Sequence, residues 1–576
     1  MVGQVICIRG YVRECPEQPL CEIFHKRTPR SFCYVISGFG PLPDIETASL
    51  QFDHTPLASE KATRYGCRNM TRLFPLLLAV ICSVPFCLSA DEKQTKQDEK
   101  PSEKKDAAPE DKVSITKHTG TFGGRELKYT ATAGTIVVSR KEKGPKASMF
   151  HVAYTLDDVK DPKTRPVTFC FNGGPGSSAV WLHLGGFGPK RVQMTEDGMM
   201  PNPPFRLGDN PESILRVTDL VFIDPVSTGF SRSDDEKKAN EFHNFQGDLD
   251  SVAEFIRLYT TRNGRWLSPK FLAGESYGAF RAAGVAQELH DDFGLYLNGI
   301  ILVSGVLSFD TLWGSDLSYV TFLPALSETA AYFQKLPDEL LQNPDKRREE
   351  VEAFAEGAYA SALLKGNRIS EEETDAVAAQ VARFTGINKE LVKRHDLRIP
   401  SGFFREELLR DEGLMIGRFD SRVTGRDGNL AGSSPEYDPS YSVVFGPFSA
   451  ALNDYVRRDL KFESDLIYEI LSSRVRPWDF GDAFIGQPVN VLHKLSSVMS
   501  ENPTLKVMVN CGYQDLATPY SAIRHSLGHL NVDPALLENI EYTFYEGGHM
   551  MYTIEKSNTG WNRDVASFIE KNSGLQ

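Results

Sequence analysis

The feature that most constrains the fold is a series of short apolar runs, each followed at once by small or polar residues. Four runs share this form: Val167–Phe171, Leu220–Ile223, Lys270–Ala273 and Lys506–Asn510. Continuous apolar runs are typical of strands buried on both faces of a parallel sheet, with functional loops at the strand ends. Between the second and third runs, residues 248–261 carry one apolar helical stripe. Strand, helix and strand in this order predict an α/β fold with a mostly parallel central sheet flanked by helices.

Length, charge and cysteine positions narrow the class of protein. The chain has 576 residues and a net charge of −13, which allows a large elaborated domain and provides no broad basic field for nucleic acid. Seven of the nine cysteines lie before residue 90, which leaves Cys170 and Cys511 for the rest of the chain. The body of the protein is therefore not a disulfide scaffold, and the cellular compartment has to be inferred from targeting signals.

A candidate targeting signal begins at Met70. Arg72 precedes the apolar run Leu73–Leu88, and Ala90 closes the segment. A basic start, a short apolar core and a small residue for cleavage predict a signal peptide over residues 70–90. A buried helix or a membrane anchor is the alternative, but the run is short for a span. We expect an exported protein, periplasmic or secreted, with no stable membrane span after cleavage.

Two further segments flank this signal. Because a signal peptide begins a chain, residues 1–69 are interpreted as a non-native extension from a mis-assigned start, with translation beginning at Met70. Residues 91–112 are almost wholly charged or small residues, which cannot bury enough apolar surface to fold, so this segment is predicted to be a disordered linker.

The remaining chain is predicted to contain a core and one insertion, which we call the cap. The core comprises residues 113–306 and 497–572, and the cap comprises residues 307–496. In the cap the strand pattern stops and helical segments replace it; one of them, residues 370–385, begins with the capping-box pair Ser370 and Glu373. Caps of this kind shape substrate pockets.

The first chemical motif is Gly274-Glu275-Ser276-Tyr277-Gly278, a G-x-S-x-G pattern. It lies between an apolar run and an alanine-rich helical run. Glycines on both sides allow a turn so sharp that the serine hydroxyl is exposed above the sheet. The pattern alone is common by chance, but its place between a predicted strand and a predicted helix makes Ser276 a candidate nucleophile.

A serine nucleophile needs a general base and an acid that orients the base. In α/β-hydrolases these residues follow in the order serine, aspartate or glutamate, histidine. Asp515 follows the last apolar run, and His549 lies in Gly547-Gly548-His549-Met550, after the strand-like stretch 540–544. Ser276, Asp515 and His549 are therefore the predicted catalytic triad; a turn aspartate and a structural histidine are the alternatives.

An oxyanion needs backbone N–H donors. These usually come from the residue after the nucleophile and from a glycine-rich loop behind an earlier strand. Tyr277 and Gly174, in Asn172-Gly-Gly-Pro-Gly176, fit these places, although an ordinary turn is the alternative for the loop. The sequence contains no zinc-type ligand spacing and no phosphate loop, so we expect no metal and no organic cofactor.

Together these motifs resemble the serine carboxypeptidase family of the α/β-hydrolase superfamily. Its signatures are an Asn-Gly-Gly-Pro-Gly loop, a Gly-Glu-Ser-Tyr elbow and a Gly-Gly-His-Met loop, and all three occur here in the family's order. The resemblance covers about residues 168–302 and 506–552. It implies an α/β-hydrolase fold, and it implies that Asn172, Gly173 and Glu275 bind the terminal carboxylate of a peptide substrate.

The sequence also departs from the family pattern. Gly186 stands where the family has a second carboxylate-binding glutamate. Ser177 replaces a disulfide cysteine of many members, so the chain resembles a bacterial-type member without the family's disulfides. Arg281, or an arginine of Arg418–Arg422, could compensate for the lost glutamate, although surface positions are the expected role for these arginines.

The resulting prediction is a serine-type carboxypeptidase that releases C-terminal residues from peptides through an acyl-enzyme. Peptides are the expected partners. Because of Gly186, two alternatives stay open: an esterase or acyltransferase on the same triad, and a non-catalytic exported binding protein on a hydrolase fold. The complete set of serine, aspartate and histidine argues against the second.

Overall fold

The computed structural model describes residues 111–139, 144–429 and 431–575, all within the unit that begins at Ser102. The predicted extension, signal peptide and most of the linker lie outside the described residues. The four apolar runs form strands, as predicted. These are β4 (Val167–Phe171), β7 (Asp219–Ile223), β9 (Lys270–Glu275) and β13 (Lys506–Gly512).

The strands join one ten-stranded sheet of order β1-β2-β3-β7-β4-β9-β10-β13-β14, with β8 (Arg232–Ser233) paired to β3. From β7 to β14 (Ile540–Tyr545), through β10 (Gly299–Val303), every pairing is parallel. The antiparallel strands β1 (Val113–Phe122), β2 (Arg125–Ser139) and β3 (Lys146–Leu156) extend the β7 edge. The apolar runs did not predict these strands; in β1, exposed and half-buried residues alternate up to the buried Phe122, so no continuous apolar run marks the strand.

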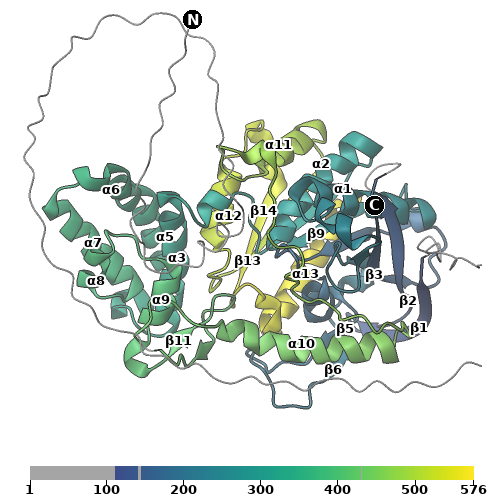
Figure 1. Ribbon diagram of the computed structural model, residues 1–576, viewed down its shortest axis with the longest axis horizontal. Coiled ribbons are helices and arrows are strands. Elements are labelled where there is room, and N and C mark those ends of the chain that lie inside the picture. The colour runs from purple at the N-terminus through teal and green to yellow at the C-terminus, as the bar shows by residue number, and fades with distance from the viewer. Residues whose placement is uncertain (1–110, 140–143, 430, 576) are drawn as a thin grey trace, which may run out of the picture. The chain divides into compact units, whose positions relative to one another are not determined.

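Helices cover both faces of the sheet (Figure 1). One face packs against α1 (Phe245–Arg262), α2 (Tyr277–Phe293), α11 (Leu492–Glu501) and α12 (Tyr520–Gly528). The other packs against α10 (Pro439–Arg458), α13 (Glu555–Asn572) and the π-helix η3 (Leu182–Phe187). Within β4, Phe169 and Phe171 belong to the first core and Cys170 to the second. This two-sided burial explains the continuous apolar runs, and the architecture is the α/β-hydrolase fold that the sequence predicted.

The predicted cap contains two different parts. Helices α3 to α9 share an apolar core of their own, with Leu326, Val351 and Phe384 among its members, and they form one green group in Figure 1. These helices are α3 (Asp316–Tyr332), α4 (Asp338–Leu341), α5 (Pro344–Phe354), α6 (Ala360–Lys365), α7 (Glu371–Thr385), α8 (Lys389–Arg394) and α9 (Ser401–Glu407). By contrast, Phe448 and Tyr455 of α10 pack into the core of the sheet.

The helix-capping residues predicted inside the cap occupy the ends of α7 in the structure. Ser370 is the N-cap of α7, and its hydroxyl accepts a hydrogen bond from the Glu373 N–H at 3.1 Å. Gly386 ends the helix with a φ of 71°, a left-handed conformation that favours glycine. The helix predicted over residues 370–385 therefore corresponds to α7 (Glu371–Thr385), with Ser370 as its N-cap.

Neither a membrane-spanning helix nor a disulfide is found in the part of the chain that the structure describes. No helix there is both long and apolar enough to cross a bilayer. Cys170 and Cys511 are buried and unbonded to each other.

Candidate active site

Ser276 occupies the sharp turn between β9 and α2. Its φ and ψ are 63° and −127°, a conformation that a non-glycine residue adopts only where the surrounding structure enforces it. A Cβ on Gly274 would lie 2.1 Å from the Gly278 carbonyl oxygen, and one on Gly278 would lie 2.8 Å from the Phe171 carbonyl oxygen. The two glycines of the motif are therefore required by close backbone packing, and the turn leaves Ser276 partly exposed.

Asp515 and His549 lie in the loops after β13 and β14 and contact each other. His549 Nδ1 lies 2.8 Å from Asp515 Oδ2. The other carboxylate oxygen, Oδ1, accepts the N–H groups of Ala517 at 2.7 Å and Thr518 at 3.0 Å. The Thr518 hydroxyl adds contacts of 2.9 Å to Asp515 Oδ2 and 3.0 Å to His549 Nδ1. These contacts direct Nδ1 of the imidazole toward the carboxylate and leave Nε2 for the pocket.

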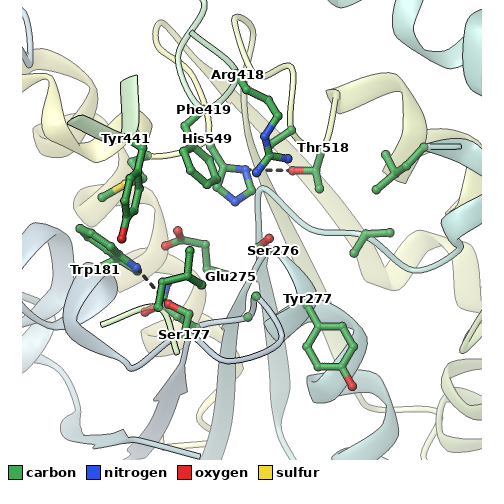
Figure 2. Close-up of a pocket in the computed structure, with 18 of the residues that line it drawn as sticks. Ser177, Trp181, Glu275, Ser276, Tyr277, Arg418, Phe419, Tyr441, Thr518 and His549 are labelled. Carbon is green, nitrogen blue, oxygen red and sulfur yellow. Dashed lines mark hydrogen bonds between the residues drawn. The ribbon is translucent and has the colours of Figure 1, made fainter. Parts of the chain in front are cut away.

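Figure 2 shows the imidazole of His549 above Ser276 in the same pocket. Burial is the largest effect on the pKa of His549 and lowers it, but the hydrogen-bonded Asp515 carboxylate and other nearby charges together outweigh burial, so the pKa is raised. The Glu275 carboxylate acts in the same direction, and the Arg418 charge opposes it. A raised pKa makes the imidazole a better proton acceptor for the serine hydroxyl.

The loop after β4 brings the predicted oxyanion donors together. A Cβ on Gly173 would lie 2.4 Å from the Tyr277 nitrogen, so only glycine allows this loop to lie against the elbow. The N–H groups of Gly174 and Tyr277 have no hydrogen-bond acceptor among the described residues. Both residues line the pocket with Ser276, so two free donors are available to a developing oxyanion.

Glu275 and Asn172 line the same pocket. The Glu275 carboxyl is buried; Tyr552 donates its hydroxyl proton to Glu275 Oε2 at 2.6 Å, and the Asn172 side chain forms a second hydrogen bond. Burial raises the pKa of Glu275 to about 7, although His549, Tyr552 and Asn172 lower it. At mildly acidic pH the carboxyl is therefore neutral and can donate a hydrogen bond to a substrate carboxylate.

Gly186 has no room for the glutamate that the family carries there. A Cβ at this position would lie 2.3 Å from the Trp561 ring, and Trp561 stacks on Phe187 with a centroid distance of 4.2 Å. Besides Asn172, the hydrogen-bond partner of Glu275 is Tyr552, which lies 277 residues away in sequence. Tyr552 is not among the residues predicted from the sequence, and its place three residues after His549 is the only signal that could have suggested it.

The candidate arginines have different positions. The expectation that Arg281 lies on the surface is wrong: it is buried, its Nε donates to Asp248 Oδ2 at 2.8 Å, and Nη1 donates to the Asn172 carbonyl oxygen. Arg281 therefore holds the loop that carries Asn172. Arg422 is buried too and pairs with Asp420 at 2.6 Å. Arg418 alone among these three lines the pocket, and it is exposed.

The pocket around Ser276 has a cavity volume of about 160 Å³. Beyond the predicted site residues its wall includes residues that the sequence did not suggest, among them Trp181, Trp313, Phe419, Tyr441, Leu471 and Arg476. In the described part of the chain, one group of possible metal ligands occurs, His290, Asp291 and Glu501, and none of the three lines this pocket.

A family model described as serine carboxypeptidase matches residues 126–536. The chain belongs to the serine carboxypeptidase family. The matched range includes Ser276 and Asp515 and ends before His549. The assignment of His549 therefore rests on its position after β14 and its hydrogen bond to Asp515.

Individual relatives match over shorter stretches. The lysosomal protective protein of Mus musculus is 29% identical over 175 residues, which cover 30% of this chain and 34% of that protein. Serine carboxypeptidase-like 16 of Arabidopsis thaliana is 28% identical over 226 residues, covering 38% and 49%. The matched stretches thus span between a third and a half of the length of these relatives. A prohormone-processing carboxypeptidase from Saccharomyces cerevisiae aligns with a TM-score of 0.47 at 16% identity, covering 77% of this chain and 92% of that one.

Proposed function

We propose that this protein is a serine carboxypeptidase that releases C-terminal residues from peptides. The observation that carries the proposal is that one pocket is lined by Ser276, His549 and Glu275. The first two suit acyl transfer, and a buried carboxyl that is neutral at mildly acidic pH suits recognition of a terminal carboxylate. The cavity, about 160 Å³, is smaller than the roughly 300–1,000 Å³ of pockets for drug-sized ligands, which favours the end of a chain as ligand.

In the proposed mechanism His549 removes the hydroxyl proton of Ser276 while the serine oxygen attacks the carbonyl carbon of the last peptide bond. The N–H groups of Gly174 and Tyr277 stabilise the oxyanion. His549 then gives the proton to the departing amine, and water, deprotonated by the same imidazole, hydrolyses the acyl-enzyme. Asp515 keeps the imidazole in the tautomer that exposes Nε2 to the pocket.

The terminal carboxylate of the substrate is assigned to Asn172, the Gly173 N–H and Glu275. Tyr552 donates to Glu275 Oε2, so the second carboxyl oxygen is the one that donates to the substrate when Glu275 is protonated. When Glu275 is neutral, it also no longer raises the pKa of His549. Mildly acidic conditions therefore favour carboxylate binding, whereas the raised pKa of His549 means that further acidification protonates the imidazole and removes the base.

The deciding experiment compares an N-blocked dipeptide that has a free C-terminus with its C-terminal amide. We expect a strong preference for the free acid in kcat/KM, and no activity above background in Ser276→Ala. Equal rates for the acid and the amide, or cleavage of esters alone, would be consistent with a serine hydrolase but would exclude a carboxypeptidase.

We further propose that the protein is exported. The support is the run Leu73–Leu88 after Arg72, closed by Ala90, which has the order of a secretory signal. Fractionation of the native cells and N-terminal sequencing of the mature protein test this. We expect an extracytoplasmic protein that begins after Ala90, and a mature cytoplasmic protein that still contains Leu73–Leu88 would contradict it.

A further inference from the structure

Two arginine side chains line the catalytic pocket without a carboxylate partner. Arg418 and Arg476 are both exposed, and no aspartate or glutamate in the described residues lies within ion-pair distance of either guanidinium. Nearby arginines are paired: Arg422 contacts Asp420 at 2.6 Å, and Arg474 contacts Glu469 at 3.1 Å. The two pocket guanidinium groups are therefore available to a ligand.

The backbone that carries Arg418 is fixed to both catalytic loops. The Arg418 carbonyl oxygen accepts the Leu516 N–H at 3.1 Å, and the Phe419 carbonyl oxygen accepts the His549 N–H at 2.5 Å. The Arg418 N–H itself donates to Asp438 Oδ1 at 3.0 Å. Figure 2 shows the Arg418 guanidinium beside the imidazole of His549. The main-chain position of Arg418 is thus set by the segments that hold the predicted catalytic residues.

Arg476 reaches the pocket on a different segment, which is bonded to the oxyanion loop. The Ile470 carbonyl oxygen accepts the Ser178 N–H at 3.0 Å, and the Ser472 N–H donates to the Gly176 carbonyl oxygen at 2.8 Å. The Arg476 N–H donates to the Ser473 carbonyl oxygen at 3.0 Å. Two fixed segments, one at the histidine loop and one at the oxyanion loop, therefore each bring a cation to the pocket.

Besides these arginines, the charged or titratable side chains that line the pocket are Glu275, Tyr277, Tyr441 and His549. Glu275 is already assigned to the terminal carboxylate and is neutral at mildly acidic pH. The pocket then carries positive charge, and a guanidinium pairs with a carboxylate through two parallel hydrogen bonds. This charge favours a substrate that brings a second carboxylate.

We propose that Arg418 and Arg476 make the enzyme selective for peptides with an aspartate or glutamate side chain at one of the two positions that flank the scissile bond. This inference rests on the proposed carboxypeptidase function. The carboxylate concerned is that of a side chain, because the terminal carboxylate already has Asn172, Gly173 and Glu275 as partners.

The test measures kcat/KM for N-blocked dipeptides with glutamate or the isosteric glutamine, placed either last or second to last. We expect a preference for glutamate of about tenfold or more at one of these positions, the effect of a charge-assisted hydrogen bond. The preference should fall to near unity in the double variant Arg418→Gln/Arg476→Gln, remain in part in Arg418→Lys, and weaken with salt. Arg474→Gln, which removes a paired arginine outside the pocket, should leave it unchanged.

The outcomes separate this inference from the proposed function. Equal kcat/KM for glutamate and glutamine peptides in the wild type, or a preference that persists in the double variant, would overturn the role of the arginines and leave the carboxypeptidase intact. Failure to discriminate free acids from amides would instead overturn the proposed function. In that case the same glutamate and glutamine residues in ester substrates would still test the arginines, and melting temperatures would show that the variants are folded.

Discussion

Two regions of the pocket differ in how completely their polar side chains are paired inside the protein. One is the pair of loops that carry Asp515 and His549, and the other, which we call the outer wall, includes Arg418, Leu471 and Arg476. The Asp515 carboxylate accepts hydrogen bonds from two backbone N–H groups, a hydroxyl and the imidazole. The Arg418 and Arg476 guanidinium groups have no carboxylate partner in the described residues. Residues that perform chemistry are held in one geometry, whereas charged side chains without a carboxylate partner at a pocket are available to select the ligand.

The two regions are nevertheless connected through their backbones. The segment with Arg418 and Phe419 bonds to Leu516 and His549, and the segment with Ser472 bonds to Gly176. The main chain around Arg418 and Ser472 is therefore fixed to the loops that hold the predicted catalytic residues. Substitutions in the two regions should separate catalytic rate from substrate preference.

The largest effect on kcat is expected for Asp515→Asn, which replaces the carboxylate that accepts the hydrogen bond of His549. The asparagine amide presents N–H groups to His549 Nδ1 and favours the wrong tautomer, so kcat should fall by about 10⁴-fold. Steady-state kinetics on the free-acid dipeptide measure this. Asp533→Asn, which changes an exposed N-cap at η11 (Pro534–Asn539), is the control and should keep kcat. A loss of less than about tenfold in Asp515→Asn would show that the acid does not orient the base.

A large effect on stability is expected for Gly186→Glu, which restores the residue of the family pattern. Its Cβ would meet the Trp561 ring at 2.3 Å, and overpacking of a core typically costs about 1–3 kcal/mol. Thermal unfolding should show a clearly lower Tm. Gly357→Glu makes the same change where no atom lies within 4 Å and should leave Tm nearly unchanged. An unaltered Tm in Gly186→Glu would mean that the site tolerates the glutamate after all.

A moderate effect is expected for Tyr552→Phe. The hydroxyl lowers the pKa of Glu275, which burial raises to about 7. In the wild type, kcat/KM for free-acid peptides should fall as pH rises through this value, because ionised Glu275 no longer donates. Without the hydroxyl the pKa of Glu275 rises further. The decrease in kcat/KM should therefore occur at a higher pH, by roughly half a pH unit to one pH unit.

Two controls sharpen this pH experiment. In Glu275→Gln the amide donates at every pH, so the alkaline fall should disappear for free-acid peptides. With a C-terminal amide as substrate, Glu275 has no carboxylate to bind, so the decrease in kcat/KM that reports loss of carboxylate binding should be absent in both the wild type and Tyr552→Phe. A wild-type rate that stays flat from about pH 5 to 8 would contradict the role of Glu275 in carboxylate binding.

The smallest effect is expected for Leu471→Ala in the outer wall. Leu471 is 40% exposed, and its backbone bridge to Ser177 does not depend on the side chain. We expect a change in KM of less than about tenfold, with kcat and Tm nearly unchanged. Leu537→Ala, at the same exposure and outside the pocket, is the matched control. A hundredfold loss of kcat would mean that the wall takes part in the chemistry.

The sequence by itself determined the parallel strands, the elbow with Ser276, the positions of Asp515 and His549 behind late strands, and the boundaries of α7. These features depend on local patterns, since two-sided burial, tight turns and helix capping are set by neighbouring residues. The antiparallel strands β1 to β3 were not predicted; at the edge strand β1, burial alternates and forms no continuous apolar run.

Only the tertiary structure decided which side chains meet across the chain. Tyr552 reaches Glu275 from 277 residues away, Trp561 fills the space beside Gly186, and Arg281 turns inward to Asp248 while Arg418 and Arg476 remain in the pocket wall. The physical reason is that a side chain's partner depends on how distant segments pack, and no local period or motif encodes that packing.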